Sequence, residues 1–270
     1  AFYAAAIAIG LMLVITVLFY KEPERVLEKR SFGEKLREIG EALADKRFAL
    51  FLLLLGLGFW IPFWAFFNLC ALYVDRSLDT VRLYEVLRGV LGQGVADFLS
   101  HEEGGQRRIL GETISHTGYI IMILQVAVSS VVARFKPMPT FFTGLAVAAC
   151  GFVVLGLAAT AGAPLVFLGI LLFATGEMIA SPRIQEYIQR LAPREKAGLY
   201  SGTNFLAVGV GAFSGVLYTP LYGRFAEAGT PGHVWYVVAA HALAGLVALA
   251  VFQRFAGTMA EVAEGAAPKA

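Results

Sequence analysis

Seven apolar stretches, separated by polar and charged segments, dominate this sequence of 270 residues. Each is long enough to cross about 30 Å of hydrocarbon, which takes roughly 20 residues of helix. The pattern therefore predicts an all-α membrane protein with about seven transmembrane helices. The predicted spans lie at residues 1–20, 49–74, 117–134, 139–160, 164–182, 199–222 and 234–254.

The composition agrees with this pattern. Hydrophobic residues make up 58% of the chain, charged residues 16%, and the mean hydropathy is +0.69. A soluble domain is usually about half apolar and about a quarter charged, so these values favour a chain that is embedded in lipid. The net charge of +2 gives no electrostatic signature of nucleic-acid binding. We therefore expect a lipid bilayer, and no nucleic acid, as a partner.

The sequence contains no signature of an enzyme or of a metal site. A P-loop, a nucleophile elbow and a zinc motif are all absent. Cys70 and Cys150 lie in apolar stretches, where cysteine behaves as a small hydrophobic residue, and the four histidines show no ligand spacing. We expect no cofactor, no metal and no enzymatic activity.

Two polar segments interrupt the predicted spans at length. The linker at 21–48 contains an amphipathic pattern at 32–46, which predicts a helix lying at the membrane surface or against the bundle. A merely solvated charged linker is the alternative. The insertion at 75–116 shows a looser helical pattern, and residues 255–270 form a polar tail. The apolar positions of the linker pattern are Phe32, Leu36, Ile39 and Leu43.

Basic residues alternate by side along the predicted topology. Sixteen of the 22 Lys and Arg residues fall in the linker, in the loops after the third and fifth spans, and after the last span. The positive-inside rule therefore places the linker and the C-terminus in the cytoplasm of a multi-pass cell-membrane protein. The chain begins on an apolar stretch without a basic region before it, which favours a fragment over a signal peptide.

Glu177 stands in the middle of an apolar run. A carboxylate at that depth costs roughly 2.5–3.5 kcal/mol on insertion scales, and such residues usually handle a proton, an ion or a polar solute. A glutamate that only joins two helices is the alternative. Ser181 lies one helical turn further and shares its face. Pro182 restricts Ser181 away from the helical conformation, so we expect a distorted helix there.

Further polar and aromatic residues lie within the spans and predict a solute cavity. Trp60, Trp64 and Asn68 recur at helical spacing and share one face, although ordinary aromatic packing explains them equally well. Pro62 indicates a kink in the same helix.

Three more side chains complete the predicted cavity. Gln125 is a mid-membrane amide, and such an amide often bonds a neighbouring helix instead of a solute. Tyr200 and Asn204 repeat four residues apart and are expected to meet the face of Glu177.

Two motifs resemble the proton-dependent oligopeptide transporter family of the major facilitator superfamily. They are Phe63-Trp64-Ala65-Phe66-Phe67, and Gly176-Glu177-Met178-Ile179-Ala180-Ser181-Pro182 with Leu191-Ala192-Pro193 and Gly198 after it. The order of spans is similar to helices six to twelve of that superfamily, so residues 49–254 would form its C-terminal six-helix half. The resemblance implies a proton-coupling role for Glu177 and a missing N-terminal half as partner. His116-Thr117-Gly118 stands where the family usually has an Asn-Pro pair.

The pattern and the resemblance together favour a secondary active transporter. The expected activity is proton-coupled symport of a small polar solute, with peptides as one candidate, by alternating access. A non-transporting membrane sensor or scaffold of the same fold is the alternative. A membrane-embedded enzyme is the weakest interpretation, because no paired acid, base or nucleophile is found.

Overall fold

The computed structural model describes residues 2–21, 31–192 and 196–256. Parts of the predicted linker (22–30), of the loop motif (193–195) and of the tail (257–270) lie outside the described residues. The chain divides into two units, residues 1–37 and 38–270. Each unit is described here by itself.

The first unit contains helix α1 (Phe2–Phe19) and the start of α2 (Phe32–Ala44). The Ser31 hydroxyl accepts from the Glu34 amide at 3.2 Å, and the Glu34 carboxylate accepts from the Ser31 amide at 2.6 Å. This reciprocal pair is a capping box, and it explains why a helix begins directly after Ser31. The helix predicted at 32–46 is therefore present, while its place at a membrane surface stays a prediction.

The second unit opens with one long helical segment. Helix α3 (Lys46–Leu55) passes through a π-helical turn, η1 (Gly56–Trp60), into α4 (Ile61–Ser77). Asp45 caps α3 because its carboxylate accepts from the amides of the first turn. Pro62 stands at the start of α4, where its missing N–H is tolerated after the π turn.

The insertion at 75–116 folds into helices and a hairpin. Its elements are α5 (Thr80–Leu91), α6 (Gln93–Phe98), β1 (Ser100–Glu103), β2 (Gln106–Ile109) and α7 (Gly111–Ser115). The strands pair antiparallel across the turn Gly104-Gly105, where both residues have positive φ angles of 59° and 73°. A two-residue Gly-Gly turn of this kind is favoured in hairpins, since glycine adopts positive φ at little cost. The looser helical pattern predicted a helix in the insertion, which α5 and α6 confirm, whereas the hairpin was not predicted.

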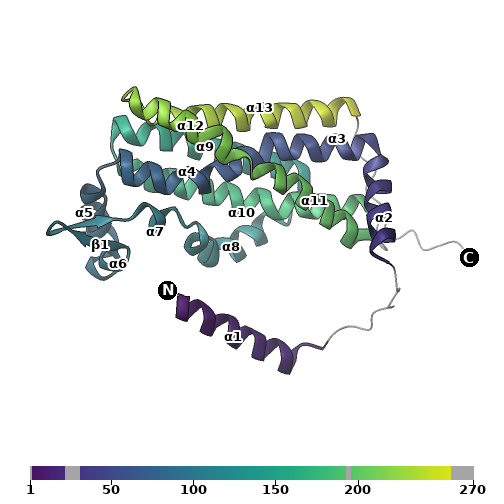
Figure 1. Cartoon of the computed structure of the whole chain (residues 1–270), viewed down its shortest axis with the longest axis horizontal. Coiled ribbons are helices and arrows are strands. Elements are labelled where there is room, and N and C mark those ends of the chain that lie inside the picture. Colours follow the sequence, from purple (N-terminus) through teal and green to yellow (C-terminus); the bar gives the residue numbers. More distant parts are fainter. Residues whose placement is uncertain (1, 22–30, 193–195, 257–270) are drawn as a thin grey trace, which may run out of the picture. The chain divides into compact units, whose positions relative to one another are not determined.

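The remaining helices make up the rest of the second unit (Figure 1). They are α8 (Gly118–Val132), α9 (Pro137–Ala161), α10 (Leu165–Leu191), α11 (Ala197–Gly211), α12 (Ser214–Glu227) and α13 (His233–Ala256). Six helical segments of the described chain are long and apolar enough to cross a membrane, in agreement with the six predicted spans from 49 to 254. The predicted span at 1–20 forms α1, and its crossing of the membrane stays a prediction.

Helix α10 continues past Pro182, and Ser181 stays helical, contrary to the prediction, while a local distortion of the helix stays a prediction. The helix continues from Leu165 to Leu191 with Pro182 inside it. Proline removes the hydrogen bond to the carbonyl four residues earlier, which here belongs to Met178. The Gln125 amide of α8 donates to that Met178 oxygen at 3.4 Å. A neighbouring helix therefore supplies the donor that proline lacks, as transmembrane helices often require.

Aromatic side chains fill the centre of the second unit. Phe66 of α4 stacks on Phe173 of α10 with ring centroids 3.9 Å apart, and Trp235 of α13 stacks on Phe152 of α9 at 6.0 Å. The Tyr73 hydroxyl donates to a backbone oxygen of α9 at 2.8 Å, so this buried polar group is satisfied. These contacts join α4, α9, α10 and α13, which lie along one another in Figure 1.

Candidate functional site

Glu177 lies half-buried in the middle of α10, within a segment long and apolar enough to cross a membrane. Its Oε2 atom accepts a hydrogen bond from the Thr117 hydroxyl at 3.1 Å. Thr117 is the residue directly before α8, and only 3% of it is exposed. The carboxyl group is therefore held between two helices by a buried hydroxyl, and it is neither fully enclosed nor paired with a described cation.

Close packing of α9 on α10 fixes the height of Glu177 along the bundle. A Cβ atom added to Gly144 of α9 would lie 2.7 Å from the Ala180 nitrogen, and one added to Gly151 would lie 2.7 Å from the Phe173 nitrogen. Side chains larger than hydrogen have no room at these positions, so the two backbones approach directly. Small residues at helix interfaces serve this purpose in membrane proteins.

The segment from α7 to Thr117 connects the C-terminal end of α4 with Glu177. The Asp75 carboxylate, near the end of α4, accepts from the Gly111 amide at 2.6 Å. Helix α7 contacts both α4 and α10, and its Ile114 and Ser115 are buried. Thr117 therefore reaches Glu177 from a segment that is anchored on α4. Sequence reasoning missed Thr117 as a site residue, although its place at the start of a predicted span made it a candidate.

The aromatic stripe that runs from η1 into α4 splits between core and surface. Trp60 is buried against Phe59 and Phe63, with ring centroids 4.7 and 5.5 Å away. Trp64 is 36% exposed, and the Asn68 amide donates to the buried Ser214 hydroxyl of α12 at 2.7 Å. The stripe therefore does not present one uniform surface, since its first indole belongs to the core.

Phe173 brings the α4 stripe close to Glu177. Its ring centroid lies 5.1 Å from that of Phe63 and 5.8 Å from that of Phe67. Phe173 and Glu177 are one helical turn apart on α10, so they share a face. Phe63 and Phe67 of α4 therefore contact a residue that lies one helical turn from Glu177 on α10.

The other predicted residues take varied positions. The Gln125 amide donates to Ser129 at 2.8 Å as well as to α10, so it serves as an interhelical contact. Tyr200 lies against the Phe48 ring at 4.8 Å. Asn204 is completely buried, and neither polar atom of its side chain has a partner among the described residues. No hydrogen bond between the described residues joins Ser181, Tyr200 or Asn204 to Glu177, and their role in a cavity stays a prediction.

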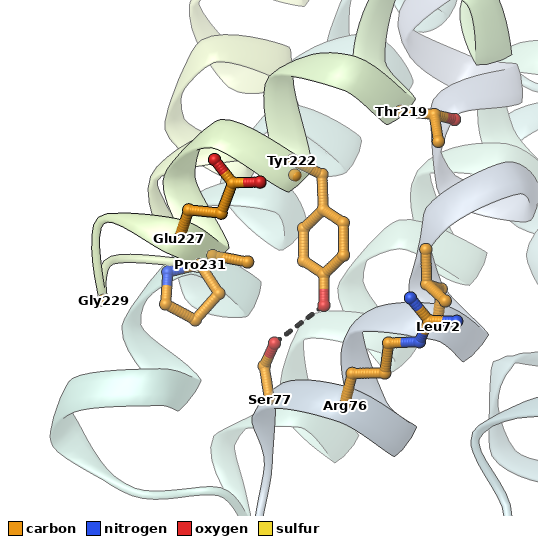
Figure 2. A pocket seen from close by; sticks show the side chains of 10 residues that line it. Leu72, Arg76, Ser77, Thr219, Tyr222, Glu227, Gly229 and Pro231 are labelled. Carbon is orange, nitrogen blue, oxygen red and sulfur yellow. Dashed lines mark hydrogen bonds between the residues drawn. The ribbon is translucent and has the colours of Figure 1, made fainter.

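A cavity of about 600 Å³ lies between the ends of α4 and α12, away from Glu177 (Figure 2). Arg76 and Ser77 line it from α4, and Tyr222 and Glu227 line it from α12. The Ser77 and Tyr222 hydroxyls share a hydrogen bond of 2.8 Å across it. None of the site residues predicted from the sequence lines this cavity.

The usual metal-ligating side chains are not clustered in the part of the chain that the structure describes. No group of three or more His, Cys, Asp or Glu residues lies close enough together for that purpose within residues 2–21, 31–192 and 196–256. Cys70 is buried, Cys150 is exposed, and both are free thiols. The chemistry available at Glu177 is therefore that of one carboxyl group and one hydroxyl.

Two solved structures share the fold. One is a crystal structure of a POT family transporter in complex with a thioalcohol-conjugated peptide, with a TM-score of 0.56 and 17% sequence identity. The other is a POT family transporter in complex with 5-aminolevulinic acid, with a TM-score of 0.56 and 16% identity. Each match covers 94% of this chain but 54% of the other, so the chain spans about half the length of these transporters.

The sequence comparisons give the family. No curated protein sequence matches the chain. The family model described as Major Facilitator Superfamily matches residues 1–216, which is most of the chain. With its six long apolar helices and its structural similarity to POT family transporters, the chain belongs to the Major Facilitator Superfamily.

Proposed function

We propose that this chain is the C-terminal half of a secondary active transporter that couples proton movement to symport of a small polar solute. Peptides are one candidate class of solute. The chain works together with an N-terminal half, because solute sites in this fold are formed between two halves. We further propose that Glu177 takes up and releases the coupled proton.

The position of Glu177 carries this proposal. An ionised carboxylate in the middle of a membrane-spanning helix is costly, and a protonated one is much less so. Its described hydrogen-bond partner is Thr117, a neutral hydroxyl that can donate to the charged form and accept from the neutral form. A site of this kind is suited to a group that changes its charge during a transport cycle.

Helix α8 supports the need for a second half. None of its residues is buried in the described structure, and Met122, Ile123 and Val126 are each more than 70% exposed. The same helix provides Gln125 and follows directly on Thr117. We propose that α8 faces the N-terminal half and that the solute path runs between the two. We also propose that the linker and the C-terminal tail lie in the cytoplasm.

A Glu177→Gln variant of the complete transporter tests the proposal. Glutamine keeps the volume and cannot ionise, so accumulation of solute driven by a pH gradient should be lost. Exchange of solute across the membrane should survive, since exchange does not require the proton to cycle. Glu112→Gln, at an exposed position of α7, is the matched control and should transport normally.

The same variant separates the alternatives. Normal proton-driven uptake by a well-expressed Glu177→Gln protein would rule out the coupling role. A wild-type protein that neither accumulates nor exchanges solute would favour the sensor or scaffold interpretation.

A further inference from the structure

The cavity between α4 and α12 carries two charges of opposite sign. Arg76 is in the last turn of α4 and Glu227 is the last residue of α12, and both side chains are exposed. Both line the cavity of about 600 Å³. In the view of Figure 2 they lie on either side of the Tyr222 ring. The volume falls in the range of about 300–1,000 Å³ that is typical of small-molecule sites.

Neither charged side chain has a bonding partner in the described second unit. Within residues 31–192 and 196–256, no ion pair or hydrogen bond of the Arg76 or Glu227 side chain is found. Asp75, the neighbouring acid on α4, is occupied by the Gly111 amide at 2.6 Å. The guanidinium and the carboxylate therefore stay available to a ligand.

The hydroxyl pair between the two helices adds a neutral donor. Ser77 and Tyr222 share one hydrogen bond of 2.8 Å, and either oxygen can be the donor. Whichever hydroxyl donates, the other keeps its own proton for a further acceptor. The bond also ties α4 to α12, the two helices that bear Arg76 and Glu227.

We infer that this cavity is a binding site for a small zwitterionic solute, with its carboxylate at Arg76 and its ammonium group at Glu227. Arginine offers a planar fork of donors to a carboxylate, while the glutamate accepts from an ammonium group. A ligand with both charges satisfies both walls at once, whereas an ion of one sign satisfies one and leaves the other unpaired. The inference rests on the proposed transport function. The cavity would serve as an access site for the solute, at the end of the bundle that carries the insertion.

Three related probes test the site on the purified complete transporter by equilibrium binding. They are 5-aminolevulinic acid with both charges, its methyl ester with the ammonium group alone, and levulinic acid with the carboxylate alone. Arg76→Gln should weaken binding of the two acids and leave the ester unchanged. Glu227→Gln should weaken binding of the two amines and leave levulinic acid unchanged.

The expected loss is about threefold to tenfold in affinity, because charge pairs open to water are screened. Binding should also weaken as salt is added. Arg82→Gln and Glu112→Gln remove exposed charges of the same types that do not line the cavity, and they should bind like the wild type.

A Glu177→Gln background separates this inference from the proposed function. Binding in the cavity between α4 and α12 should persist there, even where proton-driven uptake is lost. Equal loss of all three probes in Arg76→Gln, no loss in either variant, or no binding of 5-aminolevulinic acid to the wild type would overturn the inference.

Discussion

Replacing Gly176 by alanine should push α9 and α10 apart at the height of Glu177. A Cβ atom at position 176 would lie 2.6 Å from the Gly144 oxygen and 2.6 Å from the Ala148 nitrogen. Ordinary van der Waals contact begins at 3.4 Å, so both distances fall short by 0.8 Å. The obstacles are backbone atoms, which cannot rotate away as the end of a flexible side chain can.

The expected cost follows from this shortfall. Overpacking a well-packed interface by one methyl group costs about 1–3 kcal/mol. Glu177 directly follows the substituted residue, so a shift of α10 by several tenths of an ångström would move its carboxyl group as well. The Thr117–Glu177 bond of 3.1 Å would then approach or exceed the 3.5 Å limit of a hydrogen bond. Stability and coupling should therefore fall together.

Thermal unfolding in detergent and pH-driven uptake in liposomes measure the two effects. We expect Gly176→Ala to lower the melting temperature by several degrees and to reduce accumulation. Gly202→Ala is the matched control, since a Cβ atom there meets nothing within 4 Å. That change should be neutral or slightly stabilising, as for alanine in an open helical position. If Gly176→Ala equals Gly202→Ala in both assays, the argument from helix contact is refuted.

Three further changes have defined outcomes. Thr117→Val removes a hydrogen bond to a carboxylate, worth about 1.5–3 kcal/mol, and should reduce pH-driven uptake about tenfold or more while Thr117→Ser retains it. Gln125→Leu should lower thermal stability, but less so in a Pro182→Ala background, where the restored N–H replaces the lost donor; equal costs in both backgrounds would contradict the compensation. In intact cells an impermeant thiol reagent should label a cysteine at Ser100 and not one at Ser31, and the reverse result would invert the topology.

The course of the helices could be predicted from the sequence because bilayer thickness sets the length of each apolar stretch. The six segments from Lys46–Ser77 to His233–Phe255 follow the predicted spans closely. The hairpin in the insertion was missed because its strands have four residues each and no apolar alternation. Gly104-Gly105 was the available signal, since this dipeptide favours a two-residue turn.

The site could be predicted only in part. Glu177 was identified because an acidic residue within an apolar run stands out even when only a single sequence is considered. Thr117 was not, because a threonine at the start of a span has many ordinary roles and its partner lies 60 positions away. The unbroken course of α10 past Pro182 was also beyond local rules, since the compensating donor, Gln125, comes from another helix.

Polar bonds join helix α8 to α10 at three points along its length. With no buried residue of its own, it meets α10 through Thr117–Glu177 at one end and Gln125–Met178 in the middle. At the other end, the buried Arg183 guanidinium donates to backbone oxygens at and just after the end of α8. Interhelical hydrogen bonds in membranes contribute about 0.6–2 kcal/mol each, so each of these three contacts is a large part of the attachment.

The middle bond and the Arg183 bonds do not involve Glu177. The bond to Glu177 is different, since its acceptor changes charge when a proton binds. If Glu177 cycles as we propose, one end of α8 is therefore held more tightly in one protonation state than in the other, while the opposite end stays fixed. A change of charge at Glu177 would therefore act on one end of α8 alone, which offers a direct link between proton binding and the position of this helix.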